Sequence, residues 1–271
     1  MNNVVSIIGM HRSGTSMVTN WLYSCGLNIG TDLLRGDYTN KKGHFEDLDF
    51  LNLHKQILEE SGTHSSGLFL QEVPSLTHLQ KEKIRELIKS KNADSHQWAW
   101  KDPRTCLFLD TYSDLIPDLK SLVILRNYKT VIQSLLKRDI NRKRESDFGG
   151  IRGSVRWFFG RKKVIRSIID ENFTTYRDTT LLYFRNILKH VQNSNEQSTL
   201  VIDLDVLHSF DEEIVEYFTR EWGFTLVWVP FDSVYEKRLG KNLMDIWHLI
   251  PDDAELAGIQ KELESFKFRK G

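Results

Sequence analysis

The stretch GMHRSGTS, residues 9–16, decides the fold, and it follows the apolar run VVSII at residues 4–8. A short β-branched run that ends at a glycine is typical of a buried strand in a parallel sheet. The two glycines have the spacing of the phosphate-binding loop G-x-x-x-x-G-K-[ST], and Ser16 fills its last position. Thr15, however, stands where that loop has its lysine. Because residues 15–26 have helical apolar spacing, the sequence predicts strand, glycine loop and helix in succession.

A glycine loop that runs into a helix N-terminus forms an anion-binding site, because several backbone N–H groups point the same way. Here the loop also carries one positive charge and three hydroxyl groups. The residues predicted to bind an anion are Arg12, Ser13, Gly14, Thr15 and Ser16. The alternative is a tight turn between strand and helix, in which a Ser or Thr caps the helix and no ligand is needed.

Strands and helices alternate along the rest of the chain, which is typical of the α/β class with a central parallel sheet and helices on both faces. One domain over residues 1–271 accounts for the length. The predicted strands are 4–8, 97–101, 121–126 and 198–207, and the predicted helices are 15–26, 48–60, 75–91, 105–117, 127–140, 155–191 and 211–222.

Two further strand ends carry basic residues, and ligands of parallel sheets bind at the carboxyl ends of the strands. Lys101 ends the strand QWAWK, and Arg126 ends the strand SLVILR. Ser134 follows Arg126 by eight residues, on the next helix, so the two side chains are predicted to meet on one phosphate. The alternatives are a surface lysine at a strand exit and an arginine paired with a carboxylate.

Taken together, these three places resemble the motifs of the sulfotransferases that use 3′-phosphoadenosine 5′-phosphosulfate (PAPS). RSGTS at residues 12–16 resembles their loop for the 5′-phosphosulfate, with Arg12 where cytosolic members carry lysine. Arg126 and Ser134 match the pair that holds the 3′-phosphate, and Tyr128 replaces the proline of the usual R-N-P-K.

WKDPRTCLFLD, residues 100–110, resembles a segment of bacterial carbohydrate-type sulfotransferases. Its K-D-P is similar to that of tyrosylprotein sulfotransferases, whose lysine contacts the phosphosulfate. The resemblance covers most of residues 4–140. It implies a P-loop NTPase-like sulfotransferase fold, PAPS as donor, PAP as product, no metal, and a hydroxyl acceptor, with a sugar or glycan as the expected class. It also explains Thr15, because PAPS has no γ-phosphate. Arg12 and Lys101 are then expected to supply the charge at the leaving phosphate.

A general base is needed to take the proton of the acceptor hydroxyl. The segment GHFED, residues 43–47, stands between the loop and a predicted helix, and related bacterial members carry a similar stretch there. Glu46 is the predicted base, with His44 and Asp47 as alternatives. A carboxylate in the first turn of a helix is also favoured by the helix dipole alone, so Glu46 has a purely structural explanation as well.

Two basic segments have less specific interpretations. Residues 137–166 contain eleven Lys and Arg against three acidic residues, together with several glycines. They form either a solvated helix face with a mobile loop or a lid over the acceptor. Residues 236–242, EKRLGKN, form a weaker candidate for closing on the 3′-phosphate.

Composition excludes several classes of partner. Lys and Arg number 37 and so do Asp and Glu, which argues against general binding to nucleic acid or membranes but leaves a local charged patch open. No basic leader, apolar signal segment or membrane-spanning stretch is present, and the two cysteines do not form a disulfide framework, so a cytoplasmic protein is expected. No His and Cys spacing indicates a metal site. The sequence does not indicate an oligomeric state.

Two competing functions remain at this stage. One is a nucleoside or small-molecule kinase with a degenerate phosphate loop, which Thr15 disfavours because a kinase loop uses the lysine. The other is a nucleotide-binding module without catalysis, which would need the same donor residues but no base. Acceptor-dependent turnover separates this module from an enzyme.

Overall fold

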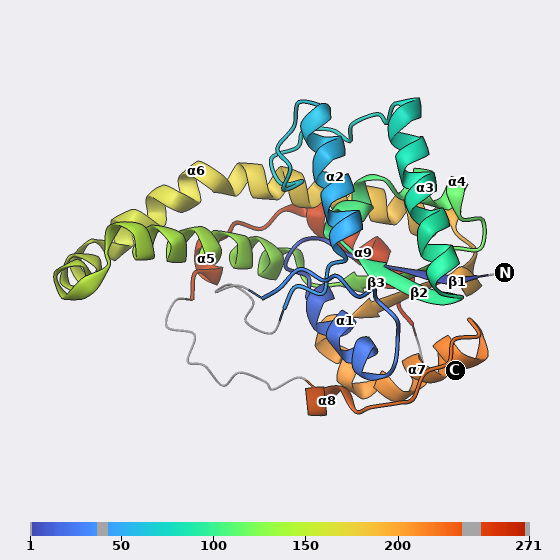
Figure 1. Ribbon diagram of the computed structural model, residues 1–271. Helices are drawn as coiled ribbons and strands as arrows, with labels where there is room; N and C mark the ends of the chain where they lie inside the picture. Colours follow the sequence, from blue (N-terminus) through green and yellow to red (C-terminus); the bar gives the residue numbers. More distant parts are fainter. Residues whose placement is uncertain (1, 37–42, 235–244, 269–271) are drawn as a thin grey trace.

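The fold is built on a four-stranded parallel sheet with the order β2-β1-β3-β4 (Figure 1). The computed structural model describes residues 2–36, 43–234 and 245–268. The strands are β1 (Asn3–Ile8), β2 (Gln97–Lys101), β3 (Lys120–Leu125) and β4 (Thr199–Asp203). The predicted α/β class and parallel sheet are confirmed. The fourth strand is shorter than predicted, because the chain turns into a 3-10 helix, η3 (Leu204–Ser209), directly after Asp203.

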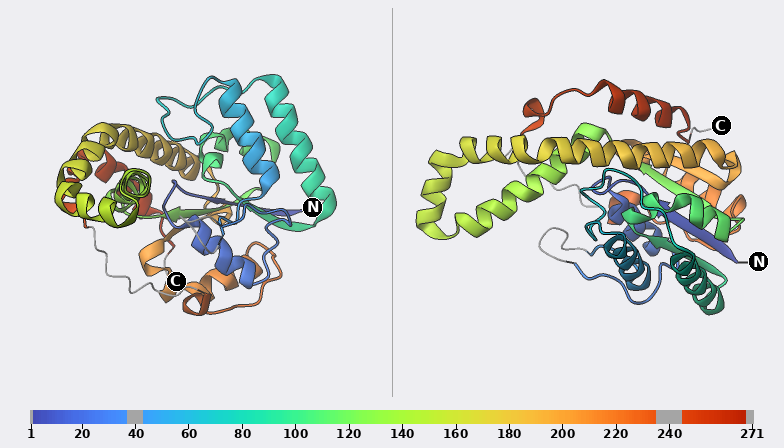
Figure 2. Two further views of the ribbon diagram at one scale, coloured as in Figure 1. Left: turned by 60° about the vertical axis from the view of Figure 1, so that its left-hand side comes forward. Right: turned by 90° about the horizontal axis from the view of Figure 1, so that it is seen from above.

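Each face of the sheet carries its own apolar core, because successive side chains of a strand point to opposite faces. Val4 and Ile8 of β1 belong to one core, and Val5 and Ile7 belong to the other. Figure 2 shows helices on both sides of the sheet, as predicted. One face is covered by α1 (Thr15–Ser24), α7 (Asp211–Arg220) and α8 (Phe231–Val234), and the other by α2 (Leu48–Glu60), α3 (His78–Asp94), α4 (Leu109–Leu115), α5 (Tyr128–Asp147), α6 (Gly150–Asn193) and α9 (Ala254–Ser265).

Several helices start at side chains that cap them. Asp47 accepts a hydrogen bond from the backbone N–H of Asp49 and so begins α2. Thr77 and Gln80 form a reciprocal capping box at the start of α3. The Asn127 side chain accepts from the first turn of α5 directly after strand β3. These caps satisfy backbone N–H groups that a helix cannot satisfy internally, and they fix where each helix begins.

Helices α5 and α6 form a long arm that projects from the domain (Figure 2). The prediction of a mobile loop within residues 137–166 is wrong, because α5 continues to Asp147 and α6 begins at Gly150. Gly153 makes this tight reversal possible. A Cβ atom at Gly153 would lie 2.4 Å from the carbonyl oxygen of Phe148, so the two helices can turn here only around a glycine.

The C-terminal part of α6 is fixed to the sheet by a buried histidine. The Nε2 atom of His190 lies 2.9 Å from Ser121 Oγ on β3, and Ser121 Oγ in turn lies 3.1 Å from Ser6 Oγ on β1. Burial lowers the pKa of His190 to about 4, because the charged imidazolium loses its hydration there.

This histidine makes stability depend on pH. Its pKa is lower in the folded than in the unfolded protein, so its contribution is complete above about pH 6.5 and is lost as the pH falls toward 4. Between pH 7 and pH 5 we expect a loss of about 2 kcal/mol in the free energy of unfolding. Urea unfolding at both pH values checks this. In His190→Gln the loss should shrink, and an unchanged loss would assign the pH dependence to other groups.

Candidate functional site

The glycine loop between β1 and α1 has a tightly defined backbone. The N–H group of Ser13 donates to the carbonyl oxygen of Met10 over 3.0 Å, and Arg12 has a left-handed φ of 70°. Gly14 has a φ of 95°, and a Cβ atom there would lie 2.4 Å from a methyl carbon of Leu204. The second glycine of the motif is therefore required by its backbone angle and by close packing.

The N-terminus of α1 is open toward this loop. Its N-cap is Gly14, which has no side chain to cap the helix, so the expected alternative with a Ser or Thr cap does not occur. The backbone N–H groups of Thr15 and Ser16 lie in the first turn, where the helix itself supplies no carbonyl oxygen to accept their hydrogen bonds. The hydroxyl of Ser13 is buried and has no hydrogen-bond partner in the part of the chain that the structure describes. Unsatisfied donors at a helix N-terminus fit an anionic group.

Arg12, Arg126 and Ser134 come together beside the loop. The Nε atom of Arg12 donates to Ser134 Oγ over 3.0 Å. The Nη1 atom of Arg126 donates to the backbone oxygen of Arg12, also over 3.0 Å. Arg126 and Ser134 thus each contact Arg12, and the Arg12 side chain, which was expected to act with Lys101, contacts Ser134.

Lys101 connects the loop to the predicted base. Its Nζ atom lies 3.3 Å from Ser16 Oγ and 2.7 Å from Glu46 Oε1. Only 1% of the Lys101 side chain is exposed, so the expected alternative of a surface lysine does not hold. Strand β2 carries Lys101 to the carboxyl edge of the sheet next to β1, which places a buried cation between two elements far apart in the sequence.

Behind Lys101 lies a buried chain of polar groups that sequence reasoning missed. Arg104 Nη1 lies 2.7 Å from Asp102 Oδ1 and 3.9 Å from Glu46 Oε2. Asp102 Oδ2 lies 2.9 Å from His54 Nδ1, and His54 Nε2 lies 2.7 Å from the hydroxyl of Tyr112. Burial opposes the charge on Asp102, but Arg104 and His54 hold the pKa of that carboxyl well below its usual range.

His11, within the loop itself, was also not predicted. Burial and the neighbouring Arg104 lower its pKa well below the usual value, so the ring is neutral at pH 7. Its Nε2 atom is buried and has no hydrogen-bond partner among the described residues, and the ring packs edge-on against Tyr183. Nothing in the glycine spacing distinguishes His11. Arg104 had one signal, its place directly after the K-D-P of the strand-end motif.

The alternative bases have different surroundings. Asp47 caps α2 and its Oδ2 atom lies 2.7 Å from Lys91 Nζ, so both of its oxygens are engaged in local structure. His44 precedes the helix in an irregular segment, where its backbone N–H donates to Leu34. Of the three candidates, the structure brings Glu46 into contact with Lys101.

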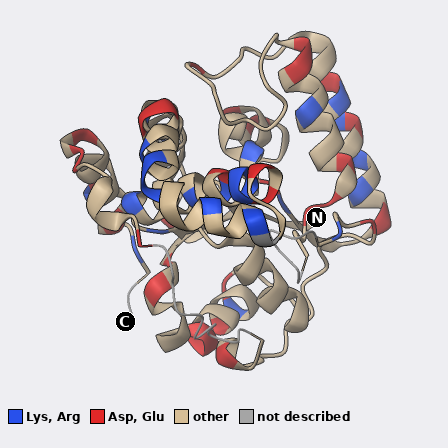
Figure 3. Ribbon diagram, turned by 90° about the vertical axis from the view of Figure 1, so that its left-hand side faces the viewer, with Lys and Arg blue, Asp and Glu red and all other residues tan. Residues whose placement is uncertain are grey.

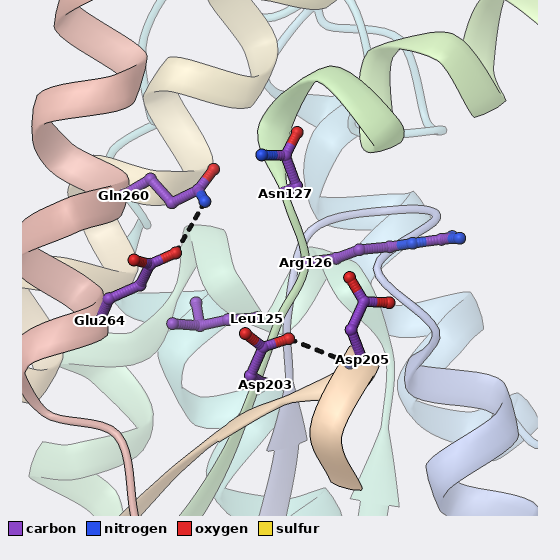
Figure 4. A pocket seen from close by; sticks show the side chains of 7 residues that line it. All are labelled: Leu125, Arg126, Asn127, Asp203, Asp205, Gln260 and Glu264. Atoms are coloured by element: carbon purple, nitrogen blue, oxygen red, sulfur yellow. Dashed lines mark hydrogen bonds between the residues drawn. The ribbon is translucent and has the colours of Figure 1, made fainter.

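A pocket of about 180 Å³ lies at the carboxyl ends of β3 and β4, against α9 (Figure 4). Three carboxylates line it, and they would repel phosphate. Asp203 Oδ2 lies 2.6 Å from Lys267 Nζ, which offsets part of this charge. The lining residues are Leu125, Arg126, Asn127, Asp203, Asp205, Gln260 and Glu264. Arg126 thus stands between this acidic pocket and the glycine loop.

Some expectations concern features other than the loop. Within residues 2–36, 43–234 and 245–268, no three His, Cys, Asp or Glu side chains are grouped to hold a metal ion. No helix in the described parts of the chain is long and apolar enough to cross a bilayer. The basic segment 236–242 lies outside the described residues.

Comparison with known structures identifies the fold. The chain is similar to a sulfotransferase domain from the curacin biosynthetic pathway, with 12% identity and a TM-score of 0.52, over 97% of this chain and 98% of that domain. It is also similar to the sulfotransferase domain of the Synechococcus PCC 7002 olefin synthase, with 14% identity and a TM-score of 0.50, over 100% and 96% of the two chains. Neither a protein-family model nor a curated protein sequence matches the chain. The predicted sulfotransferase fold is confirmed, and at these identities the likeness is one of fold.

Proposed function

We propose that the protein is a PAPS-dependent sulfotransferase that transfers the sulfuryl group to an acceptor hydroxyl. One observation carries the proposal: Lys101 Nζ contacts both Ser16 of the glycine loop and Glu46. The hydroxyl of Ser16, the buried ammonium of Lys101 and the carboxylate of Glu46 therefore lie within a few ångströms of one another. This arrangement meets the needs of an in-line transfer, in which developing charge must be stabilised and a proton removed.

Two groups of residues are assigned to bind the donor, PAPS. The open N-terminus of α1, with Ser13, Gly14, Thr15 and Ser16, binds the 5′-phosphosulfate. Arg126 and Ser134 bind the 3′-phosphate, and Arg12, which already contacts Ser134, joins them. Charged and bidentate hydrogen bonds from arginine suit a phosphate group. The hydrogen bond between Arg12 and Ser134 is then exchanged for bonds to the phosphate.

The chemical step follows from the position of Lys101. Glu46 takes the proton of the acceptor hydroxyl while the hydroxyl oxygen forms a bond to sulfur. The bond between sulfur and the bridging oxygen breaks, and its electron pair stays on the 5′-phosphate. Lys101 stabilises that developing charge, and as it turns toward the phosphate it leaves Glu46 free to accept the proton. Arg104, 3.9 Å from Glu46, keeps the resulting acid in position.

The acceptor is proposed to be a sugar or glycan hydroxyl. The support is the resemblance of WKDPRTCLFLD to bacterial carbohydrate-type sulfotransferases. A radiolabelled-PAPS screen over soluble sugars, phenols and small alcohols tests this choice separately from donor use, because donor binding is measured without any acceptor.

Calorimetric binding of PAP without Mg²⁺ tests the donor assignment. We expect PAP to bind and 5′-AMP to bind much more weakly, since 5′-AMP lacks the 3′-phosphate. Arg126→Ala should weaken PAP binding by about 10- to 100-fold, the worth of charged hydrogen bonds to one phosphate. Arg220→Ala on α7 is the matched control, because its side chain is 73% exposed and its ion-pair partner among the described residues, Glu216, lies on the same helix.

Two results would contradict the proposal. One is an absence of PAP binding by protein that thermal unfolding shows to be folded. The other is a Mg²⁺-dependent preference for ATP, which would favour the kinase alternative. PAP binding without turnover on any acceptor would instead favour the nucleotide-binding module.

A further inference from the structure

The tip of the arm is a strongly basic surface. Residues 148–169 contain six Lys and Arg and no Asp or Glu, although the 37 Lys and Arg of the whole chain are balanced by 37 Asp and Glu. All six side chains are exposed, and Figure 3 looks toward this end of the molecule. They are Arg152, Arg156, Arg161, Lys162, Lys163 and Arg166. Six clustered positive charges create a local positive potential, which attracts an anionic surface over a distance of about one Debye length.

Large apolar side chains stand among these cations. Phe158 is 64% exposed, Phe159 is 82% exposed and Val155 is 54% exposed. The two phenylalanine rings contact each other edge-on, with centroids 5.4 Å apart. Single exposed apolar residues are common on protein surfaces, but a contiguous cluster indicates a contact surface.

The exposure of these rings is a property of the folded helix rather than of a loose end. Trp157, between them and the start of α6, is only 7% exposed. Its ring packs edge-on against Phe148, and the guanidinium of Arg144 lies over it. The helix therefore buries one aromatic residue against α5 and presents the next two outward.

We propose that the tip of the arm docks on a membrane surface that carries anionic lipid headgroups. The six cations lie among the headgroups, and Phe158 and Phe159 insert into the boundary between headgroups and acyl chains. Basic residues interleaved with exposed aromatic residues on one helix are typical of such interfacial binding. A soluble polyanion such as nucleic acid would match the charge but would leave both rings without an apolar environment. The proposal does not depend on the sulfotransferase assignment.

Co-sedimentation with lipid vesicles tests this surface without donor or acceptor. The probes are vesicles of phosphatidylcholine alone and vesicles with about 30% phosphatidylglycerol. We expect binding to the anionic vesicles at 0.1 M NaCl, weak binding to the neutral ones, and marked loss at 0.5 M NaCl. Two variants should each lower the partition coefficient about tenfold or more: Lys162→Gln/Lys163→Gln/Arg166→Gln and Phe158→Ser/Phe159→Ser.

Matched variants on other surfaces separate this effect from general charge or hydrophobicity. Lys81→Gln/Arg85→Gln/Lys89→Gln removes the same charge from α3, and Leu79→Ser/Val227→Ser removes two other exposed apolar side chains. Both should bind vesicles as the parent protein does. Circular dichroism and the Tm verify that each variant is folded.

Several outcomes would overturn the proposal. These are no binding to anionic vesicles, equal binding to neutral vesicles, or equal losses in the matched variants. Another is tight binding of a DNA or RNA oligonucleotide that depends on the lysines but not on the phenylalanines, which would assign the tip to nucleic acid.

Discussion

Glu46→Gln is expected to lower kcat by about 10²- to 10⁴-fold, the usual contribution of a positioned general base. Glutamine has the same shape, and its carbonyl oxygen can still accept the hydrogen bond that Lys101 Nζ donates to Glu46 Oε1 over 2.7 Å. The loop, Lys101 and the donor residues should therefore keep their positions. Steady-state kinetics on any accepted hydroxyl, combined with PAP calorimetry, should show a large loss in kcat with nearly unchanged PAP affinity.

The neighbouring carboxylate supplies the control for this prediction. Asp47→Asn preserves the cap of α2, because asparagine caps helices as well as aspartate does. It removes only the charge opposite Lys91, so activity should stay within a few-fold of the parent. The assignment of the base would be wrong if Glu46→Gln retained full kcat while His44→Gln lost it.

Asp102→Ala is expected to destabilise the protein by about 3–5 kcal/mol, because it leaves a buried charge without its partner. The Arg104 guanidinium, 2.7 Å from Asp102, would lose its ion pair, and His54 would lose the acceptor of its ring hydrogen bond. The midpoint of thermal unfolding should fall by roughly 5–10 °C for a chain of this size. Scanning calorimetry or thermal circular dichroism measures it.

The exposed pair Asp110 and Lys189 provides a comparison of the same chemical type. Its carboxylate is 69% exposed, so Asp110→Ala should change stability little, as expected for surface ion pairs. Equal losses in the two variants would show that burial of the Asp102 pair does not matter.

Asp102 also predicts loss of stability in acid. Its pKa is depressed in the folded state, so the stability that it contributes is complete above the unfolded pKa of about 4 and falls as the pH drops below that value. The stability that His190 contributes is lost at higher pH, as the pH falls below about 6.5. The free energy of unfolding should therefore fall in two pH ranges, and His190→Gln should reduce the loss in the upper range, to which the buried His11 also contributes.

Local sequence pattern predicted most of the fold. Helix 48–60 was predicted with the bounds that the structure shows, because Asp47 caps it and its apolar spacing is regular. Large aromatic side chains are more often core residues than ligand-stacking ones, which predicts that Trp98, Trp100, Trp222 and Trp228 are buried. The first three are buried, but Trp228 is 41% exposed. The reversal near Gly153 was not predicted, because glycines in sequence indicate a loop unless a close backbone approach is known. That approach, between Gly153 and Phe148, exists only after α5 and α6 pair.

The candidate site was predictable in part, for a different physical reason. Residues at strand ends converge because the sheet is parallel, so Arg12, Lys101 and Arg126 could be named from topology. The partners of Asp102 could not be named in this way. His54 is 48 residues away from Asp102 in the sequence, and Tyr112, which contacts His54, lies on a different helix from it. Such contacts depend on how α2 and α4 pack, for which the sequence pattern has no signal. The contact of Arg12 with Ser134 is of the same kind.

The projecting arm also determines how the molecule moves through water. Helix α6 has 44 residues and thus a contour of about 66 Å at 1.5 Å per residue. A compact globule of this chain length has a radius of gyration of about 18 Å. Friction on the arm slows diffusion relative to such a globule, so a monomer of 31.8 kDa should leave a gel-filtration column early. An elution volume that suggests a dimer is therefore expected from a single chain, and mass should be taken from light scattering instead.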